Sequence, residues 1–157
     1  MPHTAFIAIG SNLGNPAEQC HRALCKIENT EGIGLIRCSS FYPTDPLVPE
    51  GVDRSTVPSY VNAVCEIETT LSPELLLERI LAVERELGRE RREKWESRLI
   101  DLDLLFYDDR VLYTGSLRLP HPEIPNRRFV LEPMREIAPG WVHPVLKQTM
   151  AEMAGKI

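Results

Sequence analysis

The order of the apolar segments limits this chain to a small number of folds. Short runs with the alternation or continuous apolarity of β-strands occupy residues 4–10, 33–42, 59–70 and 97–109. Segments with apolar residues at helical spacing separate the first strand from the second and the third from the fourth. The predicted order is strand, helix, strand, strand, helix, strand, followed by extra elements. This pattern indicates a ferredoxin-like α+β fold with a sheet packed on helices.

The two predicted helices have clear start and stop signals. Asn15 and Pro16 fit the N-cap and first helical position of the first helix, and Ser72 and Pro73 fit those of the second. Gly88 is typical of a helix end. The apolar stripes consist of Ala17, Cys20, Leu24 and Ile27 in the first helix, and of Leu76, Ile80, Val83 and Leu87 in the second.

The remaining segments predict loops and smaller elements. Residues 43–58 hold four prolines without periodicity and predict a long loop. Residues 88–98 predict a charged loop with one tryptophan, and 111–113 a short strand that pairs back on the preceding one. We expect helices over 126–137 and 144–154.

Composition limits the class of protein. A length of 157 residues with 43% hydrophobic residues suits one domain, 1–157, with a substantial core. The net charge of −5 argues mildly against a nucleic-acid binder. No signal peptide and no membrane span are expected, because no apolar run is long enough. The four cysteines lack zinc spacing and suggest buried thiols in a reducing cytoplasm, although a reactive or metal-binding thiol stays open.

Two aspartates interrupt the apolar segment 97–109. Asp101 and Asp103 are two residues apart, so in a strand they project from one face, about 7 Å apart at ~3.3 Å per residue. Neighbouring anions repel each other, so one takes a proton or a cation holds both. Magnesium suits such a pair, because it takes one or two carboxylates, water and substrate phosphates. The alternative is a solvated strand end or pairing with arginine. The opposite face would carry Ile100, Leu102, Leu104 and Phe106.

Basic side chains flank this strand in the sequence. Arginine is the preferred planar clamp for phosphate, so carboxylates, arginines and an aromatic ring fit a nucleotide triphosphate with magnesium. The basic residues are Arg89, Arg91, Arg92, Lys94 and Arg98 before the strand, and Arg127 and Arg128 after it, near His121.

Each feature also has a plain structural interpretation. Glutamates alternate with the arginines, as in a solvated loop of mixed charge. Tyr60 and Phe129 fit ordinary core aromatics, and His121 fits a loop histidine. The segment "GSNLGN" lacks the lysine of a phosphate-binding loop and favours a tight strand-to-helix turn.

Together the segments resemble the 6-hydroxymethyl-7,8-dihydropterin pyrophosphokinases of folate synthesis. The resemblance rests, in order along nearly the whole chain, on "AFIAIGSNLGN", "SSFYPTDPL", "YVNAV", "ERELGRERREKWESRLIDLDLLFY" and "LPHPEIPNRRFVLEPMREIAP". It implies a ferredoxin-like three-layer α/β/α sandwich with a mainly antiparallel sheet. It also implies transfer of pyrophosphate from ATP to the pterin, leaving AMP, with two Mg²⁺ ions.

The resemblance assigns roles to individual residues. Asp101 and Asp103 match the metal ligands, and Arg89 and Arg98 match the catalytic arginines. The ATP-side positions are Glu84, Arg91, Trp95, Arg98, His121 and Arg127. The pterin-side positions are Thr44, Leu47, Tyr60, Asn62, Trp95 and Phe129. Of these, Tyr60 and Phe129 match the residues that stack on the two faces of the pterin ring, and Asn62 matches the amide that hydrogen-bonds to its polar edge.

The sequence departs from the family pattern in the charged loop. The family commonly has "WGPR" before its D-L-D motif, whereas this chain has "WESR" in a loop that is one residue shorter. Arg91 and Arg92 are therefore alternative matches for the family's loop arginine near ATP. Pro122 follows the loop histidine where an aromatic sometimes stands, and Ser116 stands where a basic residue is expected.

Two other functional classes remain possible from the sequence. Two carboxylates on a strand also suit a metal-dependent nuclease or phosphohydrolase. A ferredoxin-like sheet also suits a binding module for RNA or a regulatory ligand, although the acidic charge disfavours it. The favoured prediction is a cytoplasmic, monomeric, stand-alone enzyme whose partners are ATP and hydroxymethyldihydropterin, with no nucleic acid and no membrane. We expect loops 43–58 and 88–97 to act as lids.

Overall fold

An antiparallel sheet with helices on both faces forms the protein in this computed structural model, which describes residues 2–12, 15–44, 51, 60–88 and 100–157. The strand order is β2-β4-β1-β5, and the short β3 pairs with the same edge of β4 as β2 does. The strands are β1 (His3–Ser11), β2 (Ile33–Cys38), β3 (Tyr42–Thr44), β4 (Tyr60–Thr69) and β5 (Asp101–Tyr107).

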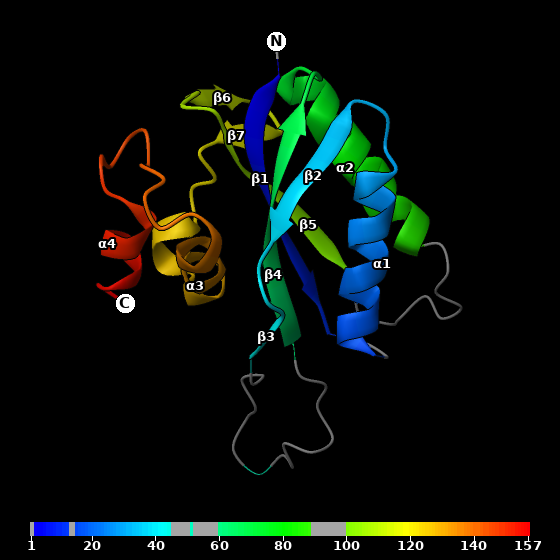
Figure 1. Ribbon diagram of the computed structural model, residues 1–157, viewed down its shortest axis with the longest axis horizontal. Helices are drawn as coiled ribbons and strands as arrows, with labels where there is room; N and C mark the ends of the chain where they lie inside the picture. The colour runs from blue at the N-terminus through cyan, green and yellow to red at the C-terminus, as the bar shows by residue number, and fades with distance from the viewer. Residues whose placement is uncertain (1, 13–14, 45–50, 52–59, 89–99) are drawn as a thin grey trace.

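The helices form the outer layers of the sandwich. Helices α1 (Pro16–Glu28) and α2 (Pro73–Gly88) cover one face of the sheet, and α3 (Arg128–Ile137) and α4 (Met150–Ala154) lie over the other (Figure 1). A 3₁₀ turn, η2 (Ile124–Asn126), precedes α3. The predicted α/β/α sandwich with an antiparallel sheet is confirmed. No helix in the described part of the chain has the length and apolarity needed to cross a membrane.

Strand alternation divides the apolar residues between two cores. In β1, Ala5, Ile7 and Ile9 belong to the core under α1 and α2, whereas Phe6 belongs to the core under α3 and α4. The predicted stripe of α2 is buried in the first of these cores, and so are Cys20, Leu24 and Ile27 of α1. Ala17, the remaining residue of the predicted α1 stripe, is exposed in the first turn of the helix. Asn15 caps α1 by accepting a hydrogen bond from the Glu18 N–H at 3.2 Å.

The strand predicted over 33–42 is two strands. At Ser39 the main-chain N–H donates to the Val64 carbonyl (2.9 Å), but the Ser39 hydroxyl replaces its carbonyl as acceptor for the Val64 N–H (2.9 Å). The regular ladder therefore stops after β2, and pairing resumes at β3. The loop predicted from residue 43 begins later, because Pro43 and Thr44 pair with β4.

A β-bulge in β5 corrects one predicted face. Ile7 pairs with Leu104 and Phe6 with Phe106, so Leu105 is an extra residue on β5. Leu105 and Phe106 both pack under α3 and α4, whereas Leu104 and Tyr107 pack in the other core. The prediction that Phe106 shares a face with Leu104 is therefore wrong. Alternation before the bulge is intact.

Two C-terminal predictions are also corrected. The strand β6 (Leu112–Thr114) pairs with β7 (Leu117–Leu119) in a separate sheet, and not with the preceding strand as predicted. The chain turns away from β5 at Asp108 and turns back at Gly115, and both residues have a positive φ. The last helix begins at Met150 and not at residue 144. Lys147 has φ 60°, and Thr149 starts α4 with a capping box to Glu152.

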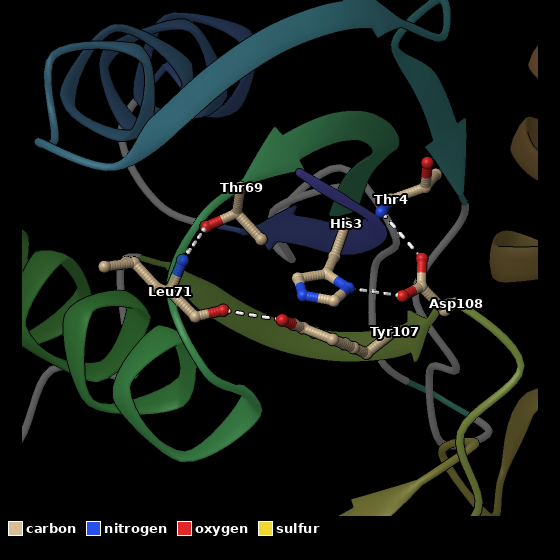
Figure 2. A network of polar contacts seen from close by, with 6 residues as sticks. All are labelled: His3, Thr4, Thr69, Leu71, Tyr107 and Asp108. Atoms are coloured by element: carbon tan, nitrogen blue, oxygen red, sulfur yellow. Dashed lines mark hydrogen bonds and ion pairs between the residues drawn. The ribbon is translucent and has the colours of Figure 1, made fainter. Parts of the chain in front are cut away.

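Polar contacts close the end of the sheet where the N-terminus lies (Figure 2). Asp108 accepts from the Thr4 N–H (2.9 Å) and lies 2.6 Å from His3 Nδ1. The buried Tyr107 donates its hydroxyl proton to the Leu71 carbonyl at 2.6 Å. Leu71 in turn donates its N–H to Thr69 Oγ1 at 3.0 Å. These contacts join β1, β4, β5 and the start of α2.

Candidate active site

Sheet pairing aligns polar residues of β4 and β5 across β1 at the opposite end of the sheet. Gly10 in β1 pairs with both Asp101 of β5 and Asn62 of β4, and the next row pairs Asp103 with Ala8. Directly paired residues share a face of the sheet. The face that carries Ala8 and Asp103 is the one covered by α3, because Ala8 packs against the core under α3 and α4. Asp101, Asp103 and Asn62 therefore form one polar surface, as strand alternation predicted for the aspartates.

Gly10 gives Asn62 the space that it occupies. A Cβ atom at Gly10 would lie 2.9 Å from Asn62 Oδ1, closer than side chains normally approach. Asn62 itself is buried, with only 7% of its surface exposed. The sequence suggested a turn for "GSNLGN", but it gave no sign that the first glycine borders a buried amide. Only the register of β1 on β4 reveals this role.

Asp103 lies beside two basic side chains from other segments. Its Oδ1 is 3.9 Å from His121 Nε2, and its Oδ2 is 3.8 Å from Arg127 Nη1. The Arg127 guanidinium also lies over the Phe129 ring, 5.6 Å from its centroid. The structure thus brings together four residues that the sequence placed at separate positions: Asp103, His121, Arg127 and Phe129.

The β5 bulge helps to hold His121. The carbonyl of the extra residue Leu105 accepts the His121 main-chain N–H at 3.0 Å. His121 Nδ1 accepts the Glu123 N–H at 3.1 Å, so a neutral ring carries its proton on Nε2, toward Asp103. Burial lowers the pKa of His121, and Arg127 adds to this effect, while Asp103 and Glu123 oppose it.

Glu84 has a contact that the sequence did not predict. From α2, its Oε2 accepts the Leu102 main-chain N–H at 2.9 Å, between the two aspartates on β5. The carboxylate therefore holds the strand segment that presents Asp101 and Asp103. The predicted ATP-side role of Glu84 stays a prediction.

The two aromatic residues predicted for the pterin side are partly exposed. Tyr60 at the start of β4 is 39% exposed, and Phe129 in the first turn of α3 is 37% exposed. Tyr60 and Asn62 share a face by alternation, and α3 packs against β4 on that face. Neither ring is fully buried, as a purely structural core aromatic would be. They fit residues that a planar ligand would cover.

Several predicted site residues are outside the described part of the structure. These are Leu47, Arg89, Arg91, Trp95 and Arg98, together with the competing Arg92. Thr44 is described through its backbone, which pairs with Tyr60. The roles assigned to these residues stay predictions.

The donor set of this site fits Mg²⁺. Asp101 and Asp103 offer oxygen ligands on one face, and the Asp103 side chain is 42% exposed, so substrate and water can reach it. Among the described residues, no three histidine, cysteine or acidic side chains form a metal-binding cluster. A site that uses two carboxylates and substrate phosphates needs no third protein ligand.

The cysteines do not contribute to this site. All four are free thiols. Burial raises the pKa of Cys20 to about 12 and that of Cys38 to about 11. Such thiols are protonated at neutral pH and react slowly. The prediction of buried thiols is confirmed for Cys20 and Cys65, whereas Cys38 is partly exposed and Cys25 is exposed.

Comparison with known proteins identifies the family. Residues 6–139 match the family described as 7,8-dihydro-6-hydroxymethylpterin-pyrophosphokinase (HPPK). A Haemophilus influenzae protein named 2-amino-4-hydroxy-6-hydroxymethyldihydropteridine pyrophosphokinase is 45% identical over 141 residues, which cover 90% of this chain and 85% of that protein. A Synechocystis protein of the same name is 37% identical over 155 residues, covering 99% and 76%.

Longer proteins contain a region similar to this chain. The Folic acid synthesis protein fol1 of Schizosaccharomyces pombe is 36% identical over 153 residues, covering 98% of this chain but 20% of that protein. A crystal structure of wild-type Plasmodium falciparum HPPK-DHPS with pterin and p-hydroxybenzoate has a similar fold, with a TM-score of 0.77 at 15% identity. The similarity covers 99% of this chain and 43% of that one. The family match and the relatives show that this chain belongs to the 7,8-dihydro-6-hydroxymethylpterin-pyrophosphokinase family, whose pyrophosphokinases serve folate biosynthesis.

Proposed function

We propose that this protein transfers pyrophosphate from ATP to 6-hydroxymethyl-7,8-dihydropterin. The products are AMP and the pterin diphosphate. The observation that carries the proposal is the aligned row of Asp101, Gly10 and Asn62, which sets the carboxylates beside a buried amide on one face. Such a row suits two substrates that meet end to end, with the phosphates at the carboxylates and the pterin at the amide. Family membership supports the same reaction.

The reaction is an in-line displacement at the β-phosphorus of ATP. The pterin hydroxyl oxygen forms the new bond to this phosphorus, the bond to the oxygen bridging the α- and β-phosphates breaks, and AMP leaves with that oxygen. The hydroxyl proton passes to solvent or to phosphate. Catalysis of such transfers relies mainly on positioning and charge stabilisation.

We propose that Asp101 and Asp103 bind two Mg²⁺ ions. When bound, these ions supply positive charge to the phosphate oxygens. Glu84 keeps the strand between the aspartates in place through the Leu102 N–H. His121 and Arg127 lie within 4 Å of Asp103, where they can bind phosphate oxygens of ATP. Arg89, Arg91, Arg98 and Trp95 complete the ATP side of the proposal.

The pterin side uses aromatic rings and an amide. Tyr60 and Phe129 present partly exposed rings that can enclose a flat heterocycle. Asn62, held across Gly10, offers a donor and an acceptor to the polar edge of the pterin. Thr44, Leu47 and Trp95 line the remainder of this proposed subsite. The protein is proposed to act in the cytoplasm as a monomer. Light scattering on the purified protein tests the monomeric state.

A product assay tests the reaction. Purified protein is mixed with Mg²⁺, ATP and 6-hydroxymethyl-7,8-dihydropterin, and the nucleotides are separated. Formation of AMP that requires the pterin supports the proposal. ATP hydrolysis without pterin would instead indicate a phosphohydrolase, and ADP as the product would indicate single phosphoryl transfer. Omission of Mg²⁺ should abolish turnover.

A further inference from the structure

Glu136 collects hydrogen bonds from a segment almost a hundred residues earlier in the chain. Its two carboxylate oxygens accept the Ser40 main-chain N–H, each at 3.0 Å. Oε2 also accepts the Ser40 hydroxyl at 2.9 Å, and Oε1 accepts the Tyr42 hydroxyl at 2.6 Å. Three donors thus fix one carboxylate on α3. None of the roles proposed above explains this arrangement.

The segment that holds Glu136 also flanks the proposed pterin subsite. In the β3–β4 pairing, Tyr42 is the partner of Asn62, and Thr44 is the partner of Tyr60. Ser39 fixes the start of this segment on β4 through its two bonds to Val64. Glu136 therefore joins α3 to the strand pair that carries Tyr60 and Asn62.

The same face of α3 carries the other proposed pterin residue. Phe129 and Glu136 are seven residues apart, so they lie on one side of the helix about 10 Å apart along its axis. The apolar residues of α3 bury against the sheet, but apolar contacts do not fix the rotation or slide of a helix as directional bonds do. The Glu136 contacts supply that directional constraint.

We infer that Glu136 is a positioning residue that sets the separation of Phe129 from Tyr60 and Asn62, and thereby the width of the pterin subsite. This inference rests on the proposed function. It concerns mainly the geometry of the bound pterin. Of the phosphate-binding residues proposed above, Arg127 is the N-cap of α3, whereas Asp101 and Asp103 lie on β5.

The charge state of Glu136 agrees with this role. The Tyr42 hydroxyl is the main cause that lowers the pKa of Glu136; burial opposes it, and the Ser40 donors add to it. The carboxylate is therefore ionised at neutral pH. On the same helix, Glu132 raises the pKa of Tyr42 and Arg135 lowers it, both more weakly than Glu136 raises it.

A second contact keeps α3 attached when Glu136 is changed. Arg37 on β2 donates from Nη1 to the Ile137 carbonyl at 3.2 Å, while its Nε lies 3.3 Å from Glu66. Since this contact and the apolar core remain, a Glu136 variant should fold with α3 in place but less firmly positioned.

The test compares three variants with a control on the same helix. Glu136→Ala removes the acceptor, Glu136→Gln retains one acceptor oxygen, and Tyr42→Phe removes one donor. Glu132→Ala is the control, because it removes a neighbouring carboxylate that bonds only to Arg135 among the described contacts. The readouts are the Kd of dihydropterin by calorimetry, KM for each substrate, kcat, and the melting temperature.

Glu136→Ala is expected to raise the Kd and KM for the pterin about tenfold, equivalent to about 1.4 kcal/mol. The increase in KM for ATP should be smaller, because Arg127 is the one proposed ATP-side residue at the start of α3. Glu136→Gln and Tyr42→Phe should give smaller increases, and Glu132→Ala none. Unchanged pterin affinity in Glu136→Ala would overturn the inference, as would equal losses for both substrates accompanied by a large fall in melting temperature. Failure of the unmodified protein to bind pterin would overturn the proposed function itself.

Discussion

At the scale of single residues, the candidate site depends on side chains whose neighbours come from distant parts of the chain. Asp103 lies close to His121 and Arg127, and Asn62 lies across Gly10. The residue types were visible in the sequence, and so was the pairing of the two aspartates on one face. The role of Gly10 was not, because it depends on which residue of β4 lies opposite.

Replacing either strand aspartate should abolish most of the turnover. Asp101→Ala or Asp103→Ala removes an oxygen ligand from the proposed magnesium site, and we expect kcat to fall by a factor on the order of 10²–10³ or more, as for other losses of charge stabilisation in a transition state. Steady-state assays of AMP formation measure this effect, and Mn²⁺ binding with a non-hydrolysable ATP analogue measures the metal site separately.

The control for this pair is Asp109→Ala, at an exposed turn after the same strand. It should leave turnover and Mn²⁺ binding unchanged. Circular dichroism should show that all three variants fold. Near-normal turnover of both strand-aspartate variants would exclude the metal assignment.

Gly10→Ala should weaken pterin binding more than ATP binding. The new methyl group would lie 2.9 Å from Asn62 Oδ1, so the amide must move from its present position. We expect the Kd of dihydropterin to rise roughly tenfold and stability to fall by about 1–3 kcal/mol. Calorimetric titration of each substrate measures the difference.

Gly140→Ala is the matched control, because a Cβ atom at Gly140 has no neighbour within 4 Å. It should preserve both affinities. A Gly10→Ala variant with unchanged pterin affinity would show that the position of Asn62 is not important for binding.

At the scale of secondary-structure elements, irregularities place the site residues. The β5 bulge turns Phe106 away from its predicted core and presents the Leu105 carbonyl to His121. The break between β2 and β3 places Ser40 and Tyr42 beside Glu136. Periodicity in a sequence predicts regular strands, so it does not reveal an extra residue or a side chain that replaces a main-chain acceptor.

The contact between Tyr42 and Glu136 should make stability depend on pH at both extremes. The bond to Glu136 is the largest cause that raises the pKa of Tyr42 from 10.0 to about 12, and it also lowers the pKa of Glu136 below 4.5. Because the pKa of Glu136 is lower in the folded than in the unfolded protein, its contact stabilises the fold at pH values above the unfolded-state pKa. This contribution disappears as the pH falls through the pKa of Glu136 in the folded protein. A raised tyrosine pKa stabilises it below 10, and this contribution disappears as the pH rises toward about 12.

Thermal melts of the unmodified protein and Tyr42→Phe across the pH range test this expectation. The difference in melting temperature should be constant between about pH 5 and about pH 9 and should shrink on either side. The control Tyr113→Phe changes an exposed tyrosine on β6 and should show no such dependence. A Tyr42→Phe difference that stays constant from about pH 3 to about pH 11 would contradict the assigned bond.

At the scale of the whole molecule, the candidate site and a network that supports stability occupy opposite ends of one sheet. The site uses the C-terminal end of β1 and the N-terminal ends of β4 and β5, whereas the contacts of His3, Tyr107 and Asp108 close the other end (Figures 1 and 2). Changes at the closed end should therefore alter stability with little effect on activity.

Tyr107→Phe tests this separation. It removes the 2.6 Å bond to the Leu71 carbonyl and keeps the buried ring. We expect a loss of about 1–2 kcal/mol in the free energy of unfolding, or roughly 3–6 °C in melting temperature, with kcat and both KM values unchanged. Urea unfolding and steady-state kinetics provide the measurements. An altered KM without a change in stability would contradict the separation.

The sequence by itself determined the order of the four main strands and the first two helices, the N-caps of those helices, the division of apolar residues between faces in regular segments, and the paired aspartates. These are local properties, because each depends on side-chain spacing along a few turns of helix or a few residues of strand. The family pattern added the reaction and a prediction of the residues that carry it. Only the tertiary structure decided that Gly10 borders Asn62, that Leu105 is a bulge residue and that Glu136 joins α3 to β3. Those contacts depend on strand register and helix placement, which arise when distant segments pack together.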